Sequence, residues 1–306
     1  MKLRSGFPAT AIWPTLAIYA MSCVMVASCE EPYKGEEYMP VYPTIDCNPE
    51  WSPDGSTIVF FHRHYDPTWK EIPDSTGLWF ISPDGADKRL FANELGGQVR
   101  WSPDGRWFLF DRAHQIWKVK VTGESLTLVL SSTGGRNYSP TWSPDGKRIA
   151  FDRFQEDGRT GIYTMAADGS DLRYIGYGAV PDWSPDGEHI AYTGLELLAV
   201  KDTNGGNDRK LVTTDDVTGG PAFSPDGSKI AFAATIGGEG GIYLIDAGGD
   251  HLRLLVRDAA CPSWSPDGRR IVYVGFIYER SRPDGFLYVV NANGSGRKRL
   301  TFGPGH

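Results

Sequence analysis

Trp51-Ser-Pro-Asp-Gly55 is the first of six copies of one short motif along the chain. The other copies occupy residues 101–105, 142–146, 183–187, 223–227 (where Phe replaces Trp) and 264–268. Their starts lie 50, 41, 41, 40 and 41 residues apart. A nearly fixed period of this length is typical of a repeated β-architecture in which each repeat forms one supersecondary unit.

The motif has the composition of a tight turn. Pro at the second position presets φ, the Ser hydroxyl caps backbone amides, and Gly supplies the positive φ that closes a hairpin. We therefore assign the turn aspartates a structural role: Asp54, Asp104, Asp145, Asp186, Asp226 and Asp267. The strand after each turn is apolar on both faces, as at residues 58–60 and 149–151, so both of its faces must be covered.

A second pair of strands follows in each repeat. Residues 161–169 read Gly-Ile-Tyr-Thr-Met-Ala-Ala-Asp-Gly, in which Asp-Gly after an apolar and aromatic run is a hairpin signal. Four strands in about 41 residues fit one blade of a β-propeller. The last copy is followed by its own partner strands at 286–290 and 298–301. The sequence thus predicts an all-β fold, a six-bladed propeller of four-stranded antiparallel blades over residues 41–306.

The repeat resembles that of a known family. Trp-Ser-Pro-Asp-Gly-x-x-Ile-Ala-Phe, with Lys298-Arg-Leu-Thr301 at a repeat end, is similar to the TolB-type propeller, a relative of WD-repeat propellers, over residues 41–301. The resemblance implies the fold; one fold hosts many functions. TolB proper, the periplasmic component of the Tol-Pal system, carries an α/β domain before its propeller. Residues 30–45 are too few for such a domain, so we expect none there.

The N-terminus has the pattern of a signal peptide. Lys2 and Arg4 precede an apolar stretch at 11–28, and no acid occurs before Glu30. Val26-Ala-Ser-Cys29 resembles the lipobox of bacterial lipoproteins, which implies cleavage after residue 28, lipidation of Cys29 and an acidic tether at 29–40. Glu30 after the cysteine implies the outer membrane, facing the periplasm. The alternatives are an uncleaved anchor and an ordinary secretory signal.

Charge and cysteine content narrow the partners. Loss of residues 1–28 removes two bases and no acid, so the net charge falls from −7 to −9. An acidic surface repels phosphate backbones, and we exclude nucleic acid as a partner.

Cys47 and Cys261 precede the first and last motif aromatics, on inner strands that the ring places side by side. In an oxidising compartment they are a candidate disulfide; the alternative is two small buried apolar side chains.

Catalytic motifs are missing from the chain. It contains no Gly-x-Ser-x-Gly, His-Glu-x-x-His, phosphate-binding loop or Cys-x-x-Cys, so we predict no enzyme, no cofactor and no metal site. His62 and His64 point to one face of a strand end and could hold a metal with a third ligand; a solvated strand end is the favoured alternative. The sequon Asn293-Gly-Ser295 is interpreted as a turn.

Recognition is expected where the repeat is irregular. The Ser-Pro-Asp-Gly turns lie on one face of the disc, here called the turn face, and the loops between second and third strands lie on the other, the loop face. Loop lengths vary at 62–76, 155–161 and 278–285, and variable loops on a rigid scaffold are common binding sites. The candidate partner-binding residues are Tyr65, Trp69, Phe154 and Tyr278.

The sequence therefore predicts a membrane-anchored, non-enzymatic propeller that binds or scaffolds an envelope protein or peptide through its loop face. Two alternatives remain open. A lyase or hydrolase of the oligogalacturonide-lyase type would need two or three histidines or carboxylates close together in the central channel. A carbohydrate-binding propeller would show exposed aromatic rings in one plane.

Overall fold

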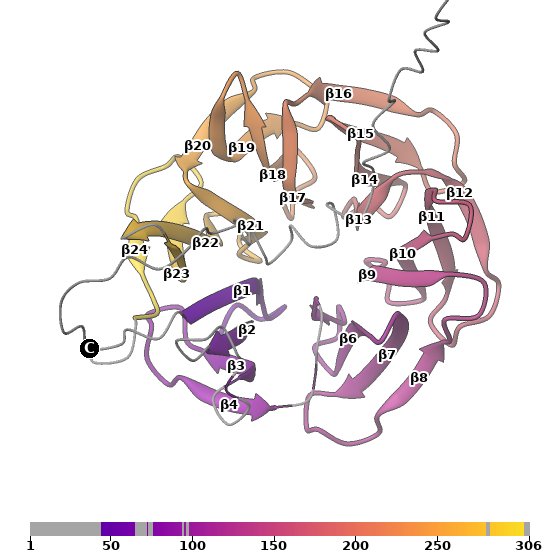
Figure 1. The fold of residues 1–306 in the computed structure, drawn as a ribbon, viewed down its shortest axis with the longest axis horizontal. Coiled ribbons are helices and arrows are strands. Elements are labelled where there is room, and N and C mark those ends of the chain that lie inside the picture. Colours follow the sequence, from indigo (N-terminus) through magenta and orange to yellow (C-terminus); the bar gives the residue numbers. More distant parts are fainter. Residues whose placement is uncertain are drawn as a thin grey trace, which may run out of the picture.

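The computed structural model describes residues 44–64, 72, 76–93, 95, 98–279 and 282–302. These residues form 24 strands, arranged as six blades around a central axis (Figure 1). The six-bladed, all-β prediction is confirmed. The proposed signal peptide, Cys29 and the tether lie outside the described residues, and no helix within them is long and apolar enough to cross a membrane.

Each blade consists of four consecutive antiparallel strands, of which the first lies next to the central axis and the fourth at the rim. The strands are β1 (Thr44–Trp51), β2 (Ile58–His64), β3 (Gly77–Ile81) and β4 (Arg89–Ala92) in blade 1; β5 (Arg100–Trp101), β6 (Trp107–Arg112), β7 (Gln115–Lys120) and β8 (Thr127–Leu130) in blade 2; β9 (Arg136–Trp142), β10 (Arg148–Phe154), β11 (Thr160–Ala166) and β12 (Arg173–Tyr177) in blade 3; β13 (Ala179–Trp183), β14 (His189–Gly194), β15 (Leu197–Asp202) and β16 (Arg209–Thr213) in blade 4; β17 (Asp216–Phe223), β18 (Lys229–Ile236), β19 (Glu239–Asp246) and β20 (Arg253–Arg257) in blade 5; and β21 (Ala259–Trp264), β22 (Arg270–Glu279), β23 (Arg282–Asn291) and β24 (Lys298–Arg299) in blade 6.

The motif forms the turn between the first and second strands of each blade. In blade 3, Ser143 Oγ donates to Asp145 Oδ1 at 2.7 Å, and the amide of Lys147 donates to the same oxygen at 3.0 Å. The amide of Arg148 donates to Ser143 Oγ at 2.9 Å, and Gly146 adopts a φ of +68°. The hydrogen bonds that Asp145 accepts from Ser143 and Lys147, that from Ser143 foremost, lower its pKa. The carboxylate is thereby committed to the turn.

A seventh Ser-Pro-Asp-Gly occurs at residues 82–85, in the β3–β4 turn of blade 1. Ser82 Oγ donates to Asp84, and the amide of Ala86 donates to Asp84 Oδ1 at 3.1 Å. The sequence pattern omitted this copy because an isoleucine stands where the motif has an aromatic residue. The same four residues thus close a hairpin at either of two places on the turn face.

The hydrophobic cores lie between blades. The second strand of each blade is fully buried at its centre, as at Phe60, Phe110, Phe151 and Phe232, because a neighbouring sheet covers each face. One core cluster joins Val59 and Phe80 of blade 1 to Phe108 of blade 2. The ring is therefore held by side-chain packing between sheets rather than by one central core.

Blades 6 and 1 close the ring without exchanging a strand. One parallel backbone pair joins Ile45 of β1 to Gly285 of β23, which merges the two blades into one eight-stranded sheet. Thr301, just after β24, donates its hydroxyl to the buried carboxylate of Asp46. Lys298 Nζ donates to the Asp84 carbonyl at 2.8 Å. Contacts near the two ends of the described chain thus meet at this interface.

Candidate functional site

The inner strands contain a recurrent bulge. The residue three positions before the motif aromatic has a positive φ: 49° at Asn48, 49° at Ser139, 49° at Val180 and 54° at Cys261. Register shifts accompany these residues in β1, β9, β13 and β21. An extra residue in one strand bends it and re-aims the flanking side chains. A β-branched residue such as Val180 adopts this conformation only when its surroundings impose it.

Buried carboxylates bind the backbone of the next blade at these inner strands. Glu50 accepts the amide of Trp101 at 3.1 Å, and Asp182 accepts the amide of Phe223 at 2.8 Å. Asp152 accepts the amide of Val180 at 3.1 Å. Asp111 accepts backbone amides of Gln98 and Ser139. Four consecutive interfaces, from blades 1–2 to blades 4–5, are linked in this way.

Burial disfavours the ionised form of these carboxylates. It raises the pKa of Glu50 and of Asp182, in each case against the opposing effect of Arg100. It raises the pKa of Asp111 to about 6, since only amide donors oppose the loss of solvation there. Arg100 Nη1 donates to Glu50 Oε2 at 2.7 Å, and both side chains are 15% exposed. The charges around the channel therefore neutralise one another or bind backbone.

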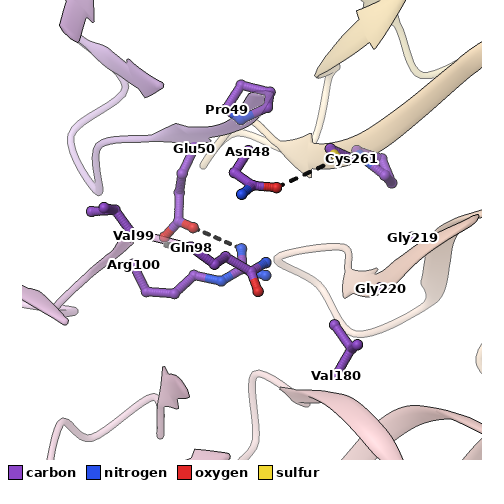
Figure 2. A pocket seen from close by; sticks show the side chains of 11 residues that line it. Asn48, Pro49, Glu50, Gln98, Val99, Arg100, Val180, Gly219, Gly220 and Cys261 are labelled. Carbon is purple, nitrogen blue, oxygen red and sulfur yellow. Dashed lines mark hydrogen bonds and ion pairs between the residues drawn. The ribbon is translucent and has the colours of Figure 1, made fainter. Parts of the chain in front are cut away.

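Little space remains at the level of this network. Asn48, Glu50, Gln98, Arg100 and Val180 help to line a cavity of about 20 Å³, room for roughly one water molecule. Figure 2 shows the Glu50 and Arg100 side chains pointing toward one another, with Val180 and Gly220 across the opening. The lining contains no histidine, and its carboxylate is paired with an arginine. The metal-dependent lyase alternative lacks its ligand set in this lining.

His62 is held in the interface between blades 1 and 6. Its Nδ1 lies 2.5 Å from Asp46 Oδ1, and its ring packs edge-on against Trp79. The Asp46 carboxylate thus makes hydrogen bonds with both the His62 ring and the Thr301 hydroxyl. Within the described residues, the group with metal-ligand spacing is Asp186, Glu188 and His189, on the surface of the blade 4 turn, and His62 is not part of it.

Cys47 and Cys261 lie where the sequence placed them, on β1 and β21. Both are thiols in the structure rather than a disulfide. The Cys261 thiol donates to Asn48 Oδ1 at 3.5 Å, and burial, together with the nearby Cys47, raises its pKa to about 12. The two sulfurs belong to one buried environment, and the bridge stays a prediction.

The candidate residues of the loop face are only partly described. Tyr65 and Trp69 lie outside the described residues, and of Tyr278 only the backbone is described, paired with Pro283. Residues 278–285 were expected to be a loop. This expectation was wrong, because β22 and β23 continue as one hairpin and leave only 280–281 between them. Phe154 ends β10 and is half-buried.

Sequence reasoning missed an aromatic cluster at the rim of blade 3. Tyr174 and Tyr177 are 47% and 57% exposed, and Arg159 Nη1 donates to the Tyr177 hydroxyl at 3.0 Å. The ring planes of Tyr163 and Tyr174 are inclined by 60°, and those of Tyr174 and Tyr177 by 77°. Rings at these angles do not form the single plane that the carbohydrate-binding alternative requires. The signal was available as three tyrosines on β11 and β12.

The comparisons agree with this architecture. A family model described as "TolB beta propeller domain" matches residues 179–306. A putative TolB from Agrobacterium tumefaciens superimposes with a TM-score of 0.63 over 71% of this chain and 86% of that one, at 23% identity. The fold is that of a TolB-type β-propeller. TolB from Acinetobacter baumannii has a TM-score of 0.59 at 20% identity, over 73% of this chain and 57% of that one.

A curated relative is the Tol-Pal system protein TolB of Anaeromyxobacter dehalogenans, 31% identical over 109 residues. The match covers 35% of this chain and 24% of the relative, so the chain spans about a quarter of that protein's length. Enzymes share the fold as well. An oligogalacturonate lyase from Vibrio parahaemolyticus has a TM-score of 0.50 at 11% identity, over 77% of this chain and 87% of that one.

Proposed function

We propose that this protein is a membrane-anchored, non-enzymatic propeller that binds or scaffolds an envelope protein or peptide through its loop face. The observation that carries the proposal is the small size of the cavity beside Glu50 and Arg100. The channel carboxylates are committed to amides and to Arg100, and the cavity left between them admits about one water. A larger ligand does not fit at this level of the channel, and we therefore assign its site to a face of the disc.

Similarity favours an envelope partner of protein nature. The curated relative is named as a component of the Tol-Pal system, and two solved neighbours are named TolB. The lipobox-like Val26-Ala-Ser-Cys29 supports a lipid anchor for the same compartment. We place the protein at the outer membrane, facing the periplasm, with no nucleic-acid partner and no cofactor.

The loop face is tested by partner capture. Tagged protein is crosslinked in intact envelopes, and Trp69→Ala and Tyr278→Ala are compared with the wild type. Both substitutions should reduce the recovered partner at least about tenfold and leave the thermal midpoint nearly unchanged, because large aromatics dominate binding hot spots. Asp145→Ala is the control, since it removes two turn hydrogen bonds and should lower the midpoint without loss of capture. The reverse result would refute the assignment of faces.

The anchor is tested separately. Cys29→Ser should abolish labelling by a palmitate analogue and release the protein from the membrane fraction. Retention of the unlabelled variant in the membrane would instead indicate an uncleaved anchor.

A further inference from the structure

The inner turns of the ring interlock at five of six interfaces. The glycine of each Ser-Pro-Asp-Gly turn sits against the proline of the preceding blade's turn, so that a Cβ on that glycine would lie 3.6–3.8 Å from the proline ring. The pairs are Gly55 with Pro266, Gly146 with Pro103, Gly187 with Pro144, Gly227 with Pro185 and Gly268 with Pro225. A Cβ on Gly105 of blade 2 would meet no described atom within 4 Å, so the corresponding contact with Pro53 is absent.

A second, outer set of interlocks breaks at the same place. The glycine of each third-to-fourth-strand turn rests on the outer strand or end of the preceding blade: Gly85 on Leu300, Gly169 on Val129, Gly205 on Ile175, Gly249 on Leu211 and Gly294 on Leu255. A Cβ on Gly123 of blade 2 would again meet no described atom within 4 Å. Both rings of contacts on the turn face are thus interrupted between blades 1 and 2, although aromatic packing closes this interface deeper inside.

A groove of about 420 Å³ lies on the turn face at this interface. We call it the seam groove; it is lined by Ser52, Pro53, Asp54, Ser56, Thr57, Trp101, Pro103, Asp104 and Gly105. Its floor includes the motif aromatic of blade 2, Trp101, which is half-buried, whereas Trp51 is only 4% exposed. The motif aromatic is therefore less covered here than in blade 1.

The blade 6–1 interface shows what covers such an aromatic. The guanidinium of Arg270, on blade 6, lies 4.8 Å from the ring centroid of Trp51, on blade 1. Arg270 stands six residues after the motif aromatic of its own blade. In blade 3 that position is Arg148, which lines one groove with Trp183 of blade 4. In blade 1 it is Thr57, whose side chain is too short to cover Trp101. The turn-face grooves at the interfaces of blades 6–1 and 3–4 contain basic side chains, and the seam groove contains none.

The walls of the seam groove carry negative charge. Asp54 and Asp104 use Oδ1 for their turn hydrogen bonds, and the described residues make no hydrogen bond to either Oδ2. The same turn hydrogen bonds lower the pKa of both groups, so both are ionised at neutral pH. No basic side chain lines the groove; the exposed Arg106 follows Asp104 but is not part of the lining.

We propose that the seam groove binds an arginine side chain of a partner polypeptide, which stacks on Trp101 as Arg270 stacks on Trp51 and pairs with Asp54 and Asp104. A guanidinium matches both demands, because it stacks on indole and hydrogen-bonds carboxylates. This site lies on the turn face and is separate from the loop face.

The test uses the peptide acetyl-Gly-Arg-Gly-amide and its citrulline counterpart, which keeps the shape but lacks the charge. Binding to the full chain is followed by NMR through the indole N–H signals, with Trp101 assigned from Trp101→Phe. The arginine peptide should shift the Trp101 signal and leave Trp51 in place, and the citrulline peptide should bind at least about tenfold more weakly.

Two matched variants decide between the groove and adventitious binding. Thr57→Arg gives blade 1 the residue that blades 3 and 6 already have, so it should fold, raise the thermal midpoint and abolish the shift at Trp101. Arg270→Thr should uncover Trp51 and make its signal respond to the peptide. Equal binding of arginine and citrulline peptides, or an unchanged response in Thr57→Arg, would overturn the proposal.

Discussion

At the scale of single residues, the same carboxylate serves two purposes according to its depth. In the turns, hydrogen bonds from serine and from backbone lower the pKa of Asp54 and its five counterparts, and the anion stabilises the hairpin. Beside the channel, burial raises the pKa of Glu50, Asp111 and Asp182. These carboxylates accept hydrogen bonds from backbone amides of the next blade, which offset part of the cost of burying the anion. The two groups respond to pH in opposite directions.

Asp111→Asn isolates one of the channel carboxylates. Burial raises the pKa of Asp111 from its ordinary value of 3.8 to about 6 in the folded protein. Its protonated form is therefore favoured by folding, and this stabilisation is complete below about pH 4 and lost as the pH rises through about 6. The free energy of unfolding, wild type minus variant, should fall by up to about 3 kcal/mol between pH 4 and pH 8. Urea unfolding across this range measures it.

The exposed Asp250→Asn serves as the control and should show no comparable trend. A difference between wild type and Asp111→Asn that stays constant over the whole pH range would contradict the assignment of burial as the cause.

Turn residues could be predicted from the sequence because their partners lie within five positions. The channel residues could not, because Glu50, Arg100 and Asp182 come from three blades and meet only in the folded ring. The unusual burial of Lys201 could have been predicted from an alignment of the repeats. Lys201 pairs in register with Ile190, where the other blades place Ile81, Val119, Met165, Ile245 and Val290. It is buried against the Tyr192 ring, and its Nζ donates to the Tyr177 carbonyl at 2.9 Å.

At the scale of elements, strand number and order followed from the period, and strand length did not. β5 has two residues where the other inner strands have five to eight, and β22 and β23 extend to ten each. Irregular lengths at equivalent positions are set by tertiary contacts, which a single repeat does not encode.

Gly169 and Gly123 offer a matched test of the interlocks. They occupy equivalent turns, with φ of +90° and +87°, so the conformational strain of an alanine is nearly the same in both. A Cβ at Gly169 would lie 2.3 Å from the Val129 carbonyl oxygen, whereas one at Gly123 would meet no described atom within 4 Å. Gly169→Ala should therefore destabilise the protein by at least about 2 kcal/mol more than Gly123→Ala.

Thermal and urea unfolding of the two variants give the comparison. Equal losses of stability would mean that the interlock contributes nothing, and the interruption between blades 1 and 2 would then have no energetic consequence.

At the scale of the whole molecule, closure of the ring is the feature that a linear sequence describes least well. The period predicted that blades 1 and 6 are neighbours, and it placed Cys47 and Cys261 on facing inner strands. It did not reveal Asp46 with His62 and Thr301, because this trio joins two adjacent strands to the far end of the propeller.

The cysteine pair carries a prediction about that closure. In protein isolated from the native envelope, peptide mapping without reductant should recover Cys47 and Cys261 joined. Their loop of about 214 residues is long, so in the entropic model the bond adds up to roughly 5 kcal/mol to the free energy of unfolding. Cys261→Ser should remove this increment, measured against reduced wild type. Two free thiols in native material would rule the bond out.

The direction of the interlocks has a consequence for assembly. Every glycine contact on the turn face places a blade upon the one that precedes it in the chain, and only Gly55 and Gly85 reach back to blade 6. During synthesis, which starts at the N-terminus, each blade from blade 3 onward can therefore pack against a blade that has already been made. Blades 1 and 2 share no such glycine contact and are joined instead by the core cluster around Phe80 and Phe108 and by the hydrogen bonds of Glu50. Closure of the ring is then a single late step, because it requires the last strand of blade 6 to have been synthesised.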